Sequence, residues 1–233
     1  MSKVLCIVPL YNKIRFLPYT IGSVVNQKEA IVVIVDDYST DGSYEWVQEN
    51  ASHLPNVHIL RNEENVGCYR TRNKGLKYAI DNGLEFDYYC VTDPDDQQFD
   101  NRFEQVLEAF NQHPNYSCFK QSYIRYNIDT NETVEKSDAG EGAAVFKREC
   151  FDLIGYWDNT LRFGGDTEYV IRLANYYHKN GEDHNAKVGK INTPLLYALN
   201  DNTGQNLTTL HPTDSPERQA VFAYINTFTD LAS

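Results

Sequence analysis

The chain has 233 residues and a mass of 26.8 kDa, with 41% hydrophobic and 23% charged residues. This length allows one sizeable hydrophobic core, so we expect a single domain over residues 1–233. The formal charge of −12 works against non-specific binding to nucleic acid or to an anionic membrane. No apolar run approaches the roughly 20 residues of a membrane-spanning helix, so we expect no stable membrane insertion. The five cysteines show no paired spacing typical of a zinc site or a redox dithiol, which favours a reducing, cytoplasmic location.

The first 115 residues alternate short apolar runs with amphipathic segments. A buried parallel strand has a continuous apolar sequence, and a helix that covers a sheet shows apolar residues at spacings of three and four. The alternation is therefore typical of repeated strand–helix–strand units around a mostly parallel sheet. In chain order, we expect a strand over 4–9, a helix over 14–25, a strand over 31–35, a helix around Trp46 and Val47, a strand over 57–60, a helix over 70–80, a strand over 88–92 and a helix over 103–110.

The second half of the chain, residues 116–233, has a looser and mixed pattern. Ser215 and Pro216 suit the N-cap and the first position of a helix near the end of the sequence. In chain order, the expected elements are β-rich segments over 117–128 and 143–146 with a polar stretch over 129–142 between them, a helix near 167–177, a strand over 194–197 and a closing helix over 217–228. The chain is thus predicted to be an α/β protein with one Rossmann-like, mostly parallel twisted sheet, flanking helices and a mixed second half.

Polar side chains follow four of the expected strands, at the point where each strand ends. In an open α/β sheet, ligands collect at the carboxyl ends of the parallel strands. An isolated pair of aspartates more often caps the next helix than binds a ligand, but the shared location of these groups favours a site. They are Tyr11 and Asn12 after the first strand, Asp36 and Asp37 after the second, residues 65–67 after the third, and Asp93, Asp95 and Asp96 after the fourth.

The sharpest single feature is Asp93-Pro94-Asp95-Asp96. Three carboxylates within four residues repel one another unless a cation lies among them. Hard oxygen ligands in a partly open site suit Mg²⁺ or Mn²⁺, which complete their coordination with water and substrate phosphates. The alternative interpretation is a solvated turn in which Asp96 or Asp100 caps the following helix.

The sequence lacks the motifs of several common enzyme classes. There is no G-x-x-x-x-G-K-[ST] phosphate loop and no G-x-G-x-x-G after the first strand. No G-x-S-x-G elbow, H-E-x-x-H pair or plausible Cys/His dyad occurs either. These absences argue against a nucleotide hydrolase, a dinucleotide-dependent oxidoreductase and the usual nucleophilic or zinc hydrolases.

Several segments, in a fixed order and spacing, carry a resemblance to a known family. They are residues 4–12, 23–27, 34–43, 65–67, 71–75 and 93–95 and, in the second half, 146–148, 154–158 and 165–168. Together they resemble the inverting nucleotide-sugar glycosyltransferases of family 2. The resemblance runs from about residue 3 to residue 173. It implies the GT-A fold, with 1–115 as the nucleotide-sugar-binding half and 116–233 as the acceptor-side half of one domain.

The resemblance also implies which residues bind the donor. Pro9, Tyr11, Asp37 and Arg72 match positions that hold the nucleotide base and ribose in similar enzymes, and Asp93 then touches the ribose or the metal. Asp95 matches the position that coordinates the divalent cation, Mn²⁺ or Mg²⁺, between the two phosphates. Asp96 is expected to orient the donor sugar or to support the metal ligands.

Asp166 matches the family's catalytic base. The chemistry requires such a group, because inversion by direct displacement needs a carboxylate to take the proton of the acceptor hydroxyl, while a bound cation stabilises the departing diphosphate. Asp166 also stands where a helix is expected to begin, so its alternative role is that of an N-cap.

The sequence departs from the family's pattern at two places. Gly164 and Gly165 stand where the family usually has a Glu before the catalytic Asp, which leaves the class of acceptor open. After the strand over 194–197, Ala198-Leu199-Asn200 stands where the family often has Arg-x-His over the diphosphate. Asn200, His184 and His211 are candidate substitutes for that contact, and each also has a structural or solvent-exposed interpretation.

Our hypothesis from the sequence is a metal-dependent, inverting, hexosyltransferase-like enzyme that uses a nucleoside-diphosphate sugar, with a UDP-sugar as the expected donor. The rival hypotheses are a non-catalytic nucleotide-sugar-binding module and a nucleotidyltransferase on a similar fold. The expected acceptor is a carbohydrate or another small hydroxyl compound. A modified DNA base is disfavoured by the charge of −12 unless Lys147, Arg148 and Arg162 form a local basic strip.

Overall fold

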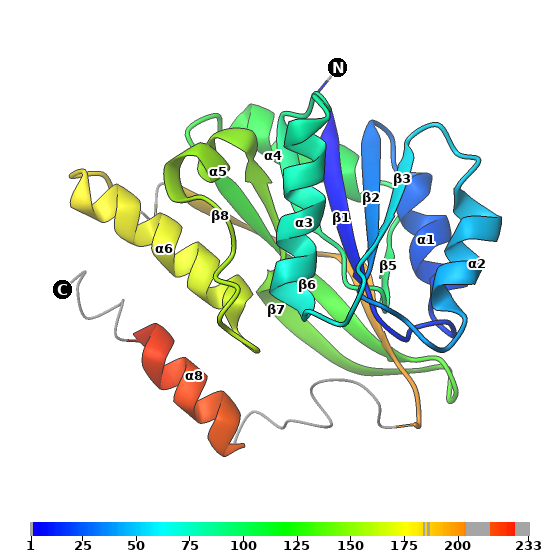
Figure 1. Ribbon diagram of the computed structural model, residues 1–233. Coiled ribbons are helices and arrows are strands. Elements are labelled where there is room, and N and C mark those ends of the chain that lie inside the picture. The colour runs from blue at the N-terminus through cyan, green and yellow to red at the C-terminus, as the bar shows by residue number, and fades with distance from the viewer. Residues whose placement is uncertain (1, 184, 186, 204–214, 227–233) are drawn as a thin grey trace.

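The structure is a computed structural model that describes residues 2–183, 185, 187–203 and 215–226. Its strands form one sheet in the order β3-β2-β1-β4-β7-β6-β8-β5, and helices flank this sheet (Figure 1). The strands are β1 (Val4–Leu10), β2 (Ala30–Asp36), β3 (Val57–Arg61), β4 (Tyr88–Val91), β5 (Asp96–Gln98), β6 (Cys118–Asn127), β7 (Glu132–Lys147) and β8 (Val188–Asn200). The helices are α1 (Leu17–Val25), α2 (Ser43–Ala51), α3 (Cys68–Asp81), α4 (Arg102–Gln112), α5 (Arg148–Ile154), α6 (Gly165–Lys179) and α8 (Pro216–Asn226).

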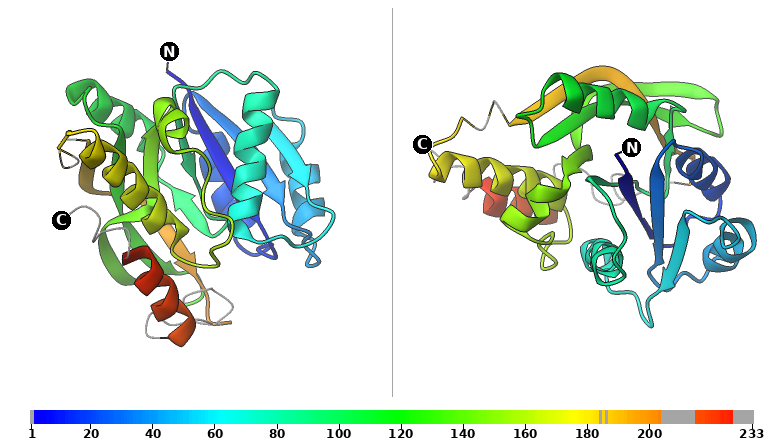
Figure 2. Two further views of the ribbon diagram at one scale, coloured as in Figure 1. Left: turned by 60° about the vertical axis from the view of Figure 1, so that its left-hand side comes forward. Right: turned by 90° about the horizontal axis from the view of Figure 1, so that it is seen from above.

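The first half is the predicted parallel layer. Strands β1, β2, β3 and β4 run parallel to one another, with Leu10 of β1 opposite Asp36 of β2 and Ile7 opposite Val91 of β4. Helices α1 and α2 lie on one face of these strands and α3 on the other (Figure 2). Because both faces are covered, every residue of β1 is buried, which explains its continuous apolar sequence.

Two hydrophobic clusters lie on opposite faces of the sheet. Val4, Cys6 and Val8 of β1 pack with α1, α2 and α4, whereas Leu5 and Ile7 pack with α3, α5 and α6. Alternate residues of one strand thus belong to different clusters, as the period of two requires. The sheet is held between two cores, so the ends of its strands have a fixed position.

In the second half of the chain, the structure differs from the expected pattern at the polar stretch between the two β-rich segments. The polar stretch over 129–142 is mostly the first part of β7, which forms a long antiparallel hairpin with β6. The first five residues of β7 are exposed, and Val134 keeps 57% of its surface accessible. Such a strand has no buried face and therefore no apolar alternation that the sequence could show. The hairpin continues the sheet from β4, through β7 and β6, to β8.

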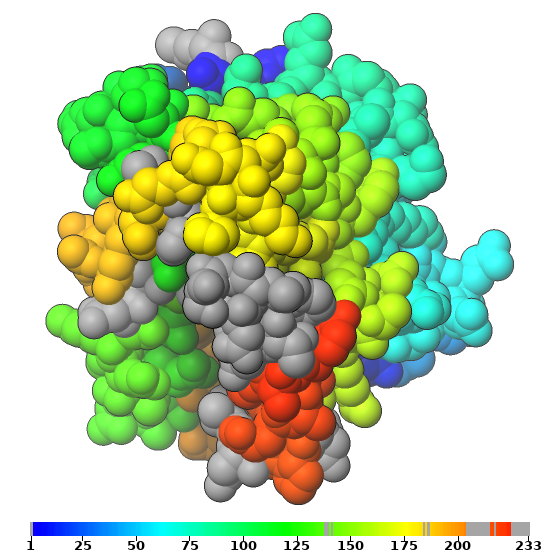
Figure 3. Space-filling model, turned by 90° about the vertical axis from the view of Figure 1, so that its left-hand side faces the viewer, coloured from blue at the N-terminus to red at the C-terminus, as the bar shows by residue number. Residues whose placement is uncertain are grey.

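The closing helix is confirmed as α8, and the predicted residues 227–228 lie outside the described part of the chain. The backbone N–H of Arg218 donates to Oγ of Ser215 at 3.4 Å, the contact expected of an N-cap serine. The guanidinium of Arg218 lies 5.5 Å from the ring of Phe163, which precedes α6. Figure 3 shows α6 and α8 on one face of the molecule. Within the described residues, no helix combines the length and the apolar character needed to cross a bilayer.

Candidate active site

The predicted polar groups come together at the carboxyl edge of the parallel strands. Pro9 lies buried within β1, and Tyr11, which follows β1, keeps 45% of its surface exposed. Asp37 follows β2, and its backbone N–H donates to the carbonyl of Leu10 at 2.7 Å. β4 pairs with β1 in parallel, on the side opposite to β2, so the aspartates that follow β4 lie at the same edge of the sheet. The strand order therefore brings together the groups that the sequence suggested.

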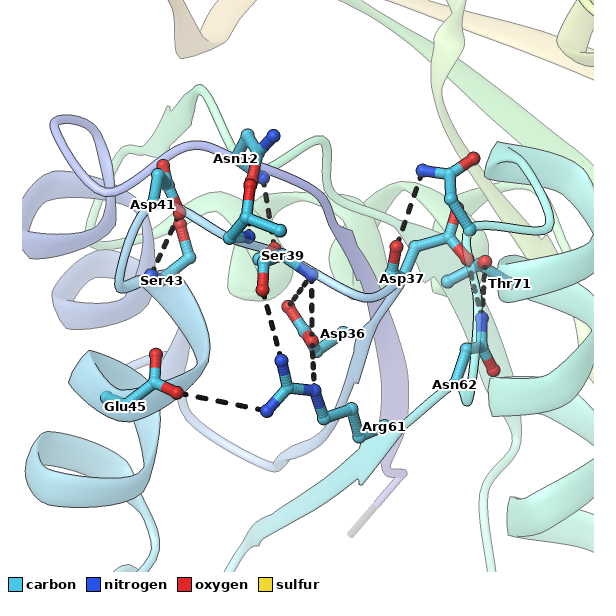
Figure 4. Close-up of polar contacts among 12 residues, drawn as sticks. Asn12, Asp36, Asp37, Ser39, Asp41, Ser43, Glu45, Arg61, Asn62 and Thr71 are labelled. Atoms are coloured by element: carbon cyan, nitrogen blue, oxygen red, sulfur yellow. Dashed lines mark hydrogen bonds and ion pairs between the residues drawn. The ribbon is translucent and has the colours of Figure 1, made fainter.

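Asp37 is buried and its carboxylate organises the loop before α3 (Figure 4). Its Oδ1 accepts hydrogen bonds from Nδ2 of Asn62 at 2.7 Å and from the backbone N–H of Val66 at 2.9 Å. Its Oδ2 accepts from the backbone N–H of Gly67 at 2.9 Å. Asp37 thus fixes the entry to α3, the helix that carries Arg72.

Its neighbour Asp36 has a structural role. The Asp36 side chain is fully buried, accepts a hydrogen bond from the backbone N–H of Ser39 at 3.1 Å and pairs with Nε of Arg61 at 3.1 Å (Figure 4). Burial raises the pKa of Asp36, and Ser39 and Arg61 oppose this rise. The two consecutive aspartates therefore hold two different loops at the same edge.

Arg72 connects residues 93–96, which we call the acidic loop, to the start of α6. Its side chain is 3% exposed, its Nη2 lies 2.9 Å from Oδ1 of Asp93, and its Nη1 pairs with Oδ1 of Asp166. Burial disfavours the charge of Arg72, but Asp166, Cys68 and Asp93 outweigh this effect and hold its pKa well above the ordinary value. One guanidinium therefore joins the expected donor-side carboxylate to the expected base.

Asp95 pairs with a lysine that sequence reasoning did not single out. Nζ of Lys13 lies 2.7 Å from Oδ2 of Asp95, and both side chains are about one-fifth exposed. Burial raises the pKa of Asp95, Lys13 lowers it, and Asp93 raises it further. The only sequence signal for Lys13 is its place directly after Tyr11 and Asn12 at the end of β1.

Asp96 belongs to β5, opposite Ala198 of β8. Helix α4 begins at Arg102 after Asn101, which makes no side-chain capping bond, so the capping alternative for Asp96 and Asp100 is wrong. Burial, Asp93 and Asp95 raise the pKa of Asp96 well above its ordinary value. Asp95 and Asp96 thus carry the cost of burial in this loop, whereas the side chain of Asp93 keeps 43% of its surface exposed.

A buried arginine, also missed from the sequence, lies close to these carboxylates. Arg102 has no exposed surface; its Nε donates to Oε1 of Gln121 at 2.6 Å, its Nη2 donates to the carbonyl of Ala143 at 3.1 Å, and its Nη1 donates to Oε1 of Gln98. Arg102 lowers the pKa of Asp96 against the stronger opposing effects. It supplies one fixed positive charge near the acidic loop and joins β5, β6 and β7.

Asp166 is the second residue of α6. The N-cap position is occupied by Gly164, whose φ of 69° is in the left-handed region that favours glycine, so Asp166 is not the N-cap. A carboxylate in the first turn is still favourable beside the helix dipole. The Asp166 side chain is 25% exposed, and a Cβ placed on Gly142 of β7 would lie 3.8 Å from its Oδ2. Asp166 therefore combines ion pairing to Arg72 with access from solvent.

The donor set fits a hard divalent cation in part. Asp93 and Asp95 offer carboxylate oxygens, which suit Mg²⁺ or Mn²⁺ when water and phosphate oxygens complete the coordination. No group of three or more His, Cys, Asp or Glu side chains is arranged as a metal site within the described residues. Asn200 is one of the three candidate substitutes for the Arg-x-His contact over the diphosphate. Its Oδ1 is buried without a hydrogen-bond partner in the described structure, and the backbone N–H of the preceding residue, Leu199, donates to the carbonyl of Asp95 at 2.7 Å. The other two candidate substitutes, His184 and His211, lie outside the described residues.

Two of the three cations considered for a DNA acceptor, Lys147 and Arg148, lie away from this edge. Lys147 lies opposite Tyr88, the first residue of β4, whereas Asp93 comes after the last residue of that strand. Arg148 pairs with Asp152 on α5 at 2.7 Å, and Arg162 lies over the ring of Phe163 at 5.5 Å. Lys147 and Arg148 therefore do not extend a basic strip to the acidic loop.

Comparison with known proteins places the chain in a family. The sequence model of Glycosyl transferase family 2 matches residues 5–222. The minor teichoic acid biosynthesis protein GgaB of Bacillus subtilis is 34% identical over 113 residues, which cover 47% of this chain and 12% of that protein. The undecaprenyl-phosphate mannosyltransferase of Micrococcus luteus is 32% identical over 108 residues, which cover 46% of this chain and 44% of that protein. The chain thus spans less than half of the length of these two relatives.

Solved structures resemble the fold over most of the chain. TarS 1-349 of S. aureus in complex with UDP-GlcNAc has a TM-score of 0.72 at 17% identity and covers 97% of this chain and 66% of that one. The mannosyltransferase PcManGT of Pyrobaculum calidifontis, in complex with GDP-Man and Mn²⁺, has a TM-score of 0.62 at 17% identity and covers 85% of this chain and 56% of that one. The expected GT-A fold is confirmed. With the family model matching nearly the whole sequence, the chain belongs to Glycosyl transferase family 2, a family of glycosyl-transferring enzymes.

Proposed function

We propose that this chain transfers a sugar from a nucleoside-diphosphate sugar, a UDP-sugar, to an acceptor hydroxyl with inversion, and that Asp166 is the general base. The observation that carries the proposal is the double ion pair of Arg72 with Asp93 and Asp166. It joins a carboxylate of the acidic loop, on the donor side, to a carboxylate at the start of α6. A sugar bound between these two sides has a leaving group on one side and a base on the other, which direct displacement requires.

The donor is bound at the carboxyl ends of β1, β2 and β4. Pro9 and the exposed ring of Tyr11 contact the nucleotide base, Asp37 and Arg72 hold the base and ribose, and Asp96 orients the sugar. Family membership and fold neighbours solved with UDP-GlcNAc and with GDP-Man support a nucleotide-sugar donor. Asp37 acts through the loop before α3 as well as by direct contact, because its carboxylate already holds Val66 and Gly67.

Asp95 and Asp93 are the residues that hold the divalent cation. Mn²⁺ or Mg²⁺ held there would supply a Lewis acid that offsets the charge of the departing diphosphate. Nζ of Lys13 lies 2.7 Å from Oδ2 of Asp95 and adds a positive charge beside this carboxylate. Both Lys13 and Arg72 limit the repulsion among the carboxylates before the donor binds.

Asp166 accepts the proton of the acceptor hydroxyl at its carboxylate. Arg72 pairs with this carboxylate and fixes its direction, and the partial exposure of Asp166 leaves room for the acceptor. The acceptor is a carbohydrate or another small hydroxyl compound bound by the half over 116–233, while the half over 1–115 binds the donor within the same domain. The rival, a binding module without turnover, is disfavoured because such a module has no need of a buried arginine that orients a second carboxylate.

The proposal is tested by incubating the chain with UDP-, GDP- and dTDP-sugars and Mn²⁺ and measuring donor hydrolysis and transfer to small glycosides. We expect turnover with a UDP-sugar, a product of inverted anomeric configuration by NMR, and a loss of turnover of at least about a hundredfold in Asp166→Asn. Nucleotide binding without hydrolysis or transfer would favour the binding module. Retained turnover in Asp166→Asn would reject this residue as the base.

A further inference from the structure

Tyr69 lies against the helix end that carries Asp166. Its side chain is 6% exposed, and its hydroxyl accepts a hydrogen bond of 2.8 Å from the backbone N–H of Gly165, the first residue of α6. An N–H at the start of a helix has no partner within that helix. Tyr69 therefore satisfies one such group from a helix that is 96 residues away in sequence.

Gly165 is required by the ring of Tyr69. A Cβ on residue 165 would lie 2.6 Å from Cε1 and from Cζ of Tyr69, a separation too short for any side chain unless the ring moves. The glycine that departs from the family's sequence pattern is thus the counterpart of a large side chain on α3. The Tyr69 ring occupies the space into which a side chain at position 165 would project.

The same ring also contacts the arginine that holds Asp166. Tyr69 and Arg72 are three residues apart on α3, and the Arg72 guanidinium lies 5.0 Å from the centre of the Tyr69 ring. Asp166 is consequently held at two points by one helix. Arg72 binds its carboxylate, and Tyr69 binds the backbone one residue before it.

We propose that Tyr69 is a positioning residue for the transfer reaction: by holding the Gly165 N–H it sets the distance between Asp166 and the donor, and Tyr69 and Gly165 form a matched pair in which the glycine leaves room for the ring. This inference rests on the proposed role of Asp166 as the base. Displacing a general base by a fraction of an ångström lowers the rate of the chemical step and leaves donor binding unchanged.

The first test is Tyr69→Phe, which removes the hydroxyl and keeps the ring. The matched control is Tyr177→Phe, because Tyr177 lies near the other end of α6 and is 4% exposed. Its hydroxyl forms a buried hydrogen bond of 2.5 Å with Oγ of Ser117. We expect kcat to fall about tenfold or more in Tyr69→Phe and less than about twofold in Tyr177→Phe. We also expect a donor Kd, measured by calorimetry with Mn²⁺ present, within about twofold of the wild type in both variants, and similar losses of unfolding free energy.

The second test is a double-mutant cycle between positions 69 and 165. Gly165→Ala alone is expected to lower kcat, because its methyl group displaces the ring and the start of α6. In Tyr69→Ala the space beside residue 165 is free of the ring. Gly165→Ala is therefore expected to lower kcat much less in Tyr69→Ala than in the wild type. Additive losses of kcat in this cycle would overturn the matched pair.

The remaining outcomes separate this inference from the proposed function. If Asp166→Asn abolishes turnover but Tyr69→Phe keeps kcat within about twofold of the wild type, the positioning role is wrong and the base stands. If Tyr69→Phe loses kcat and donor affinity together, with a much larger loss of stability than Tyr177→Phe, Tyr69 is a structural residue and the inference is overturned. If Asp166→Asn retains wild-type turnover, the proposed base fails whatever Tyr69→Phe does.

Discussion

Nζ of Lys13 lies 2.7 Å from Oδ2 of Asp95 although the two residues are 82 positions apart in the sequence. Lys13 belongs to the loop after β1, and Asp95 belongs to the acidic loop after β4. The second loop is held further by Thr20 of α1, whose hydroxyl donates to the carbonyl of Pro94 at 3.0 Å. The carboxylate proposed to bind a divalent cation thus already has a cationic partner of fixed position.

This pairing predicts competition between Lys13 and a metal ion for Asp95. In Lys13→Met, the affinity for Mn²⁺ in the absence of nucleotide should rise by about threefold to tenfold, because no ammonium group then pairs with Asp95 or repels the cation. The binding of Mn²⁺ can be followed by the loss of its free-ion EPR signal. Lys28→Met removes the same charge from an exposed position and serves as the control. Unchanged or weaker Mn²⁺ binding in Lys13→Met would contradict the prediction.

Arg102→Met should destabilise the protein strongly. The substitution leaves the side-chain oxygens of Gln98 and Gln121 and the carbonyl of Ala143 without their donor inside the core. We expect a loss of about 3 kcal/mol or more in the free energy of unfolding, measured by urea denaturation. Arg102→Lys, which keeps the charge without the planar donor group, should lose less. A loss below about 1 kcal/mol in Arg102→Met would show that the buried network contributes little.

Gly75→Ala tests the packing of α3 on the sheet. A Cβ at Gly75 would lie 2.8 Å from Cγ2 of Ile7 and 3.2 Å from Cγ2 of Val35. We expect a loss of about 1–3 kcal/mol of unfolding free energy from this overpacking. The control is Gly22→Ala in α1, where no heavy atom lies within 4 Å of the new Cβ, and there a gain of about 0.5–1 kcal/mol is expected. Equal effects of the two substitutions in urea denaturation would be inconsistent with this account.

The ion pair between Arg15 and Asp129 predicts a pH dependence of stability. Oδ1 of Asp129 lies 2.5 Å from Nη2 of Arg15, and the hydrogen bond from Arg15 holds the pKa of Asp129 below its ordinary value. Because the folded-state pKa is the lower one, ionised Asp129 stabilises the fold above its unfolded pKa of about 3.9, and this contribution is lost as the pH falls through the folded-state value. Asp129→Asn should therefore lower the unfolding midpoint at pH 7 more than below about pH 4.

The check is a series of urea denaturation curves of wild type and Asp129→Asn across that pH range. Asp152→Asn, which changes the charge of an exposed pair on α5, is the control for a non-specific charge effect. A difference in unfolding midpoint between wild type and Asp129→Asn that grows as the pH falls would contradict the prediction.

The strands β1, β2 and β4 and the site edge could be predicted because their signals are local. β1 and β2 are buried on both faces and so appear as apolar runs, and Asp93 and Asp95 stand directly after β4. The parallel order of these strands then brings the polar groups together without further information. The first part of β7 has no such signal, because its exposed residues pair with β6 without burying a face.

The contacts that organise the site could not be predicted, because they join residues far apart in the sequence. Tyr69 meets Gly165 across 96 residues, and Arg72 meets Asp166 across 94. A tyrosine on a helix and a glycine at a helix start each have an ordinary local explanation. Only the packing of α6 against α3 shows that the glycine leaves room for the ring.

The proposed metal ligand and the proposed base are tested most directly by calorimetry of UDP with and without Mn²⁺ on wild type, Asp95→Asn and Asp166→Asn, with UDP-sugar hydrolysis measured on the same samples. We expect Mn²⁺-dependent UDP binding in wild type, a loss of that dependence in Asp95→Asn, and unchanged binding with abolished hydrolysis in Asp166→Asn. Mn²⁺-dependent UDP binding that is equal in wild type and Asp95→Asn, or hydrolysis that survives in Asp166→Asn, would contradict this expectation.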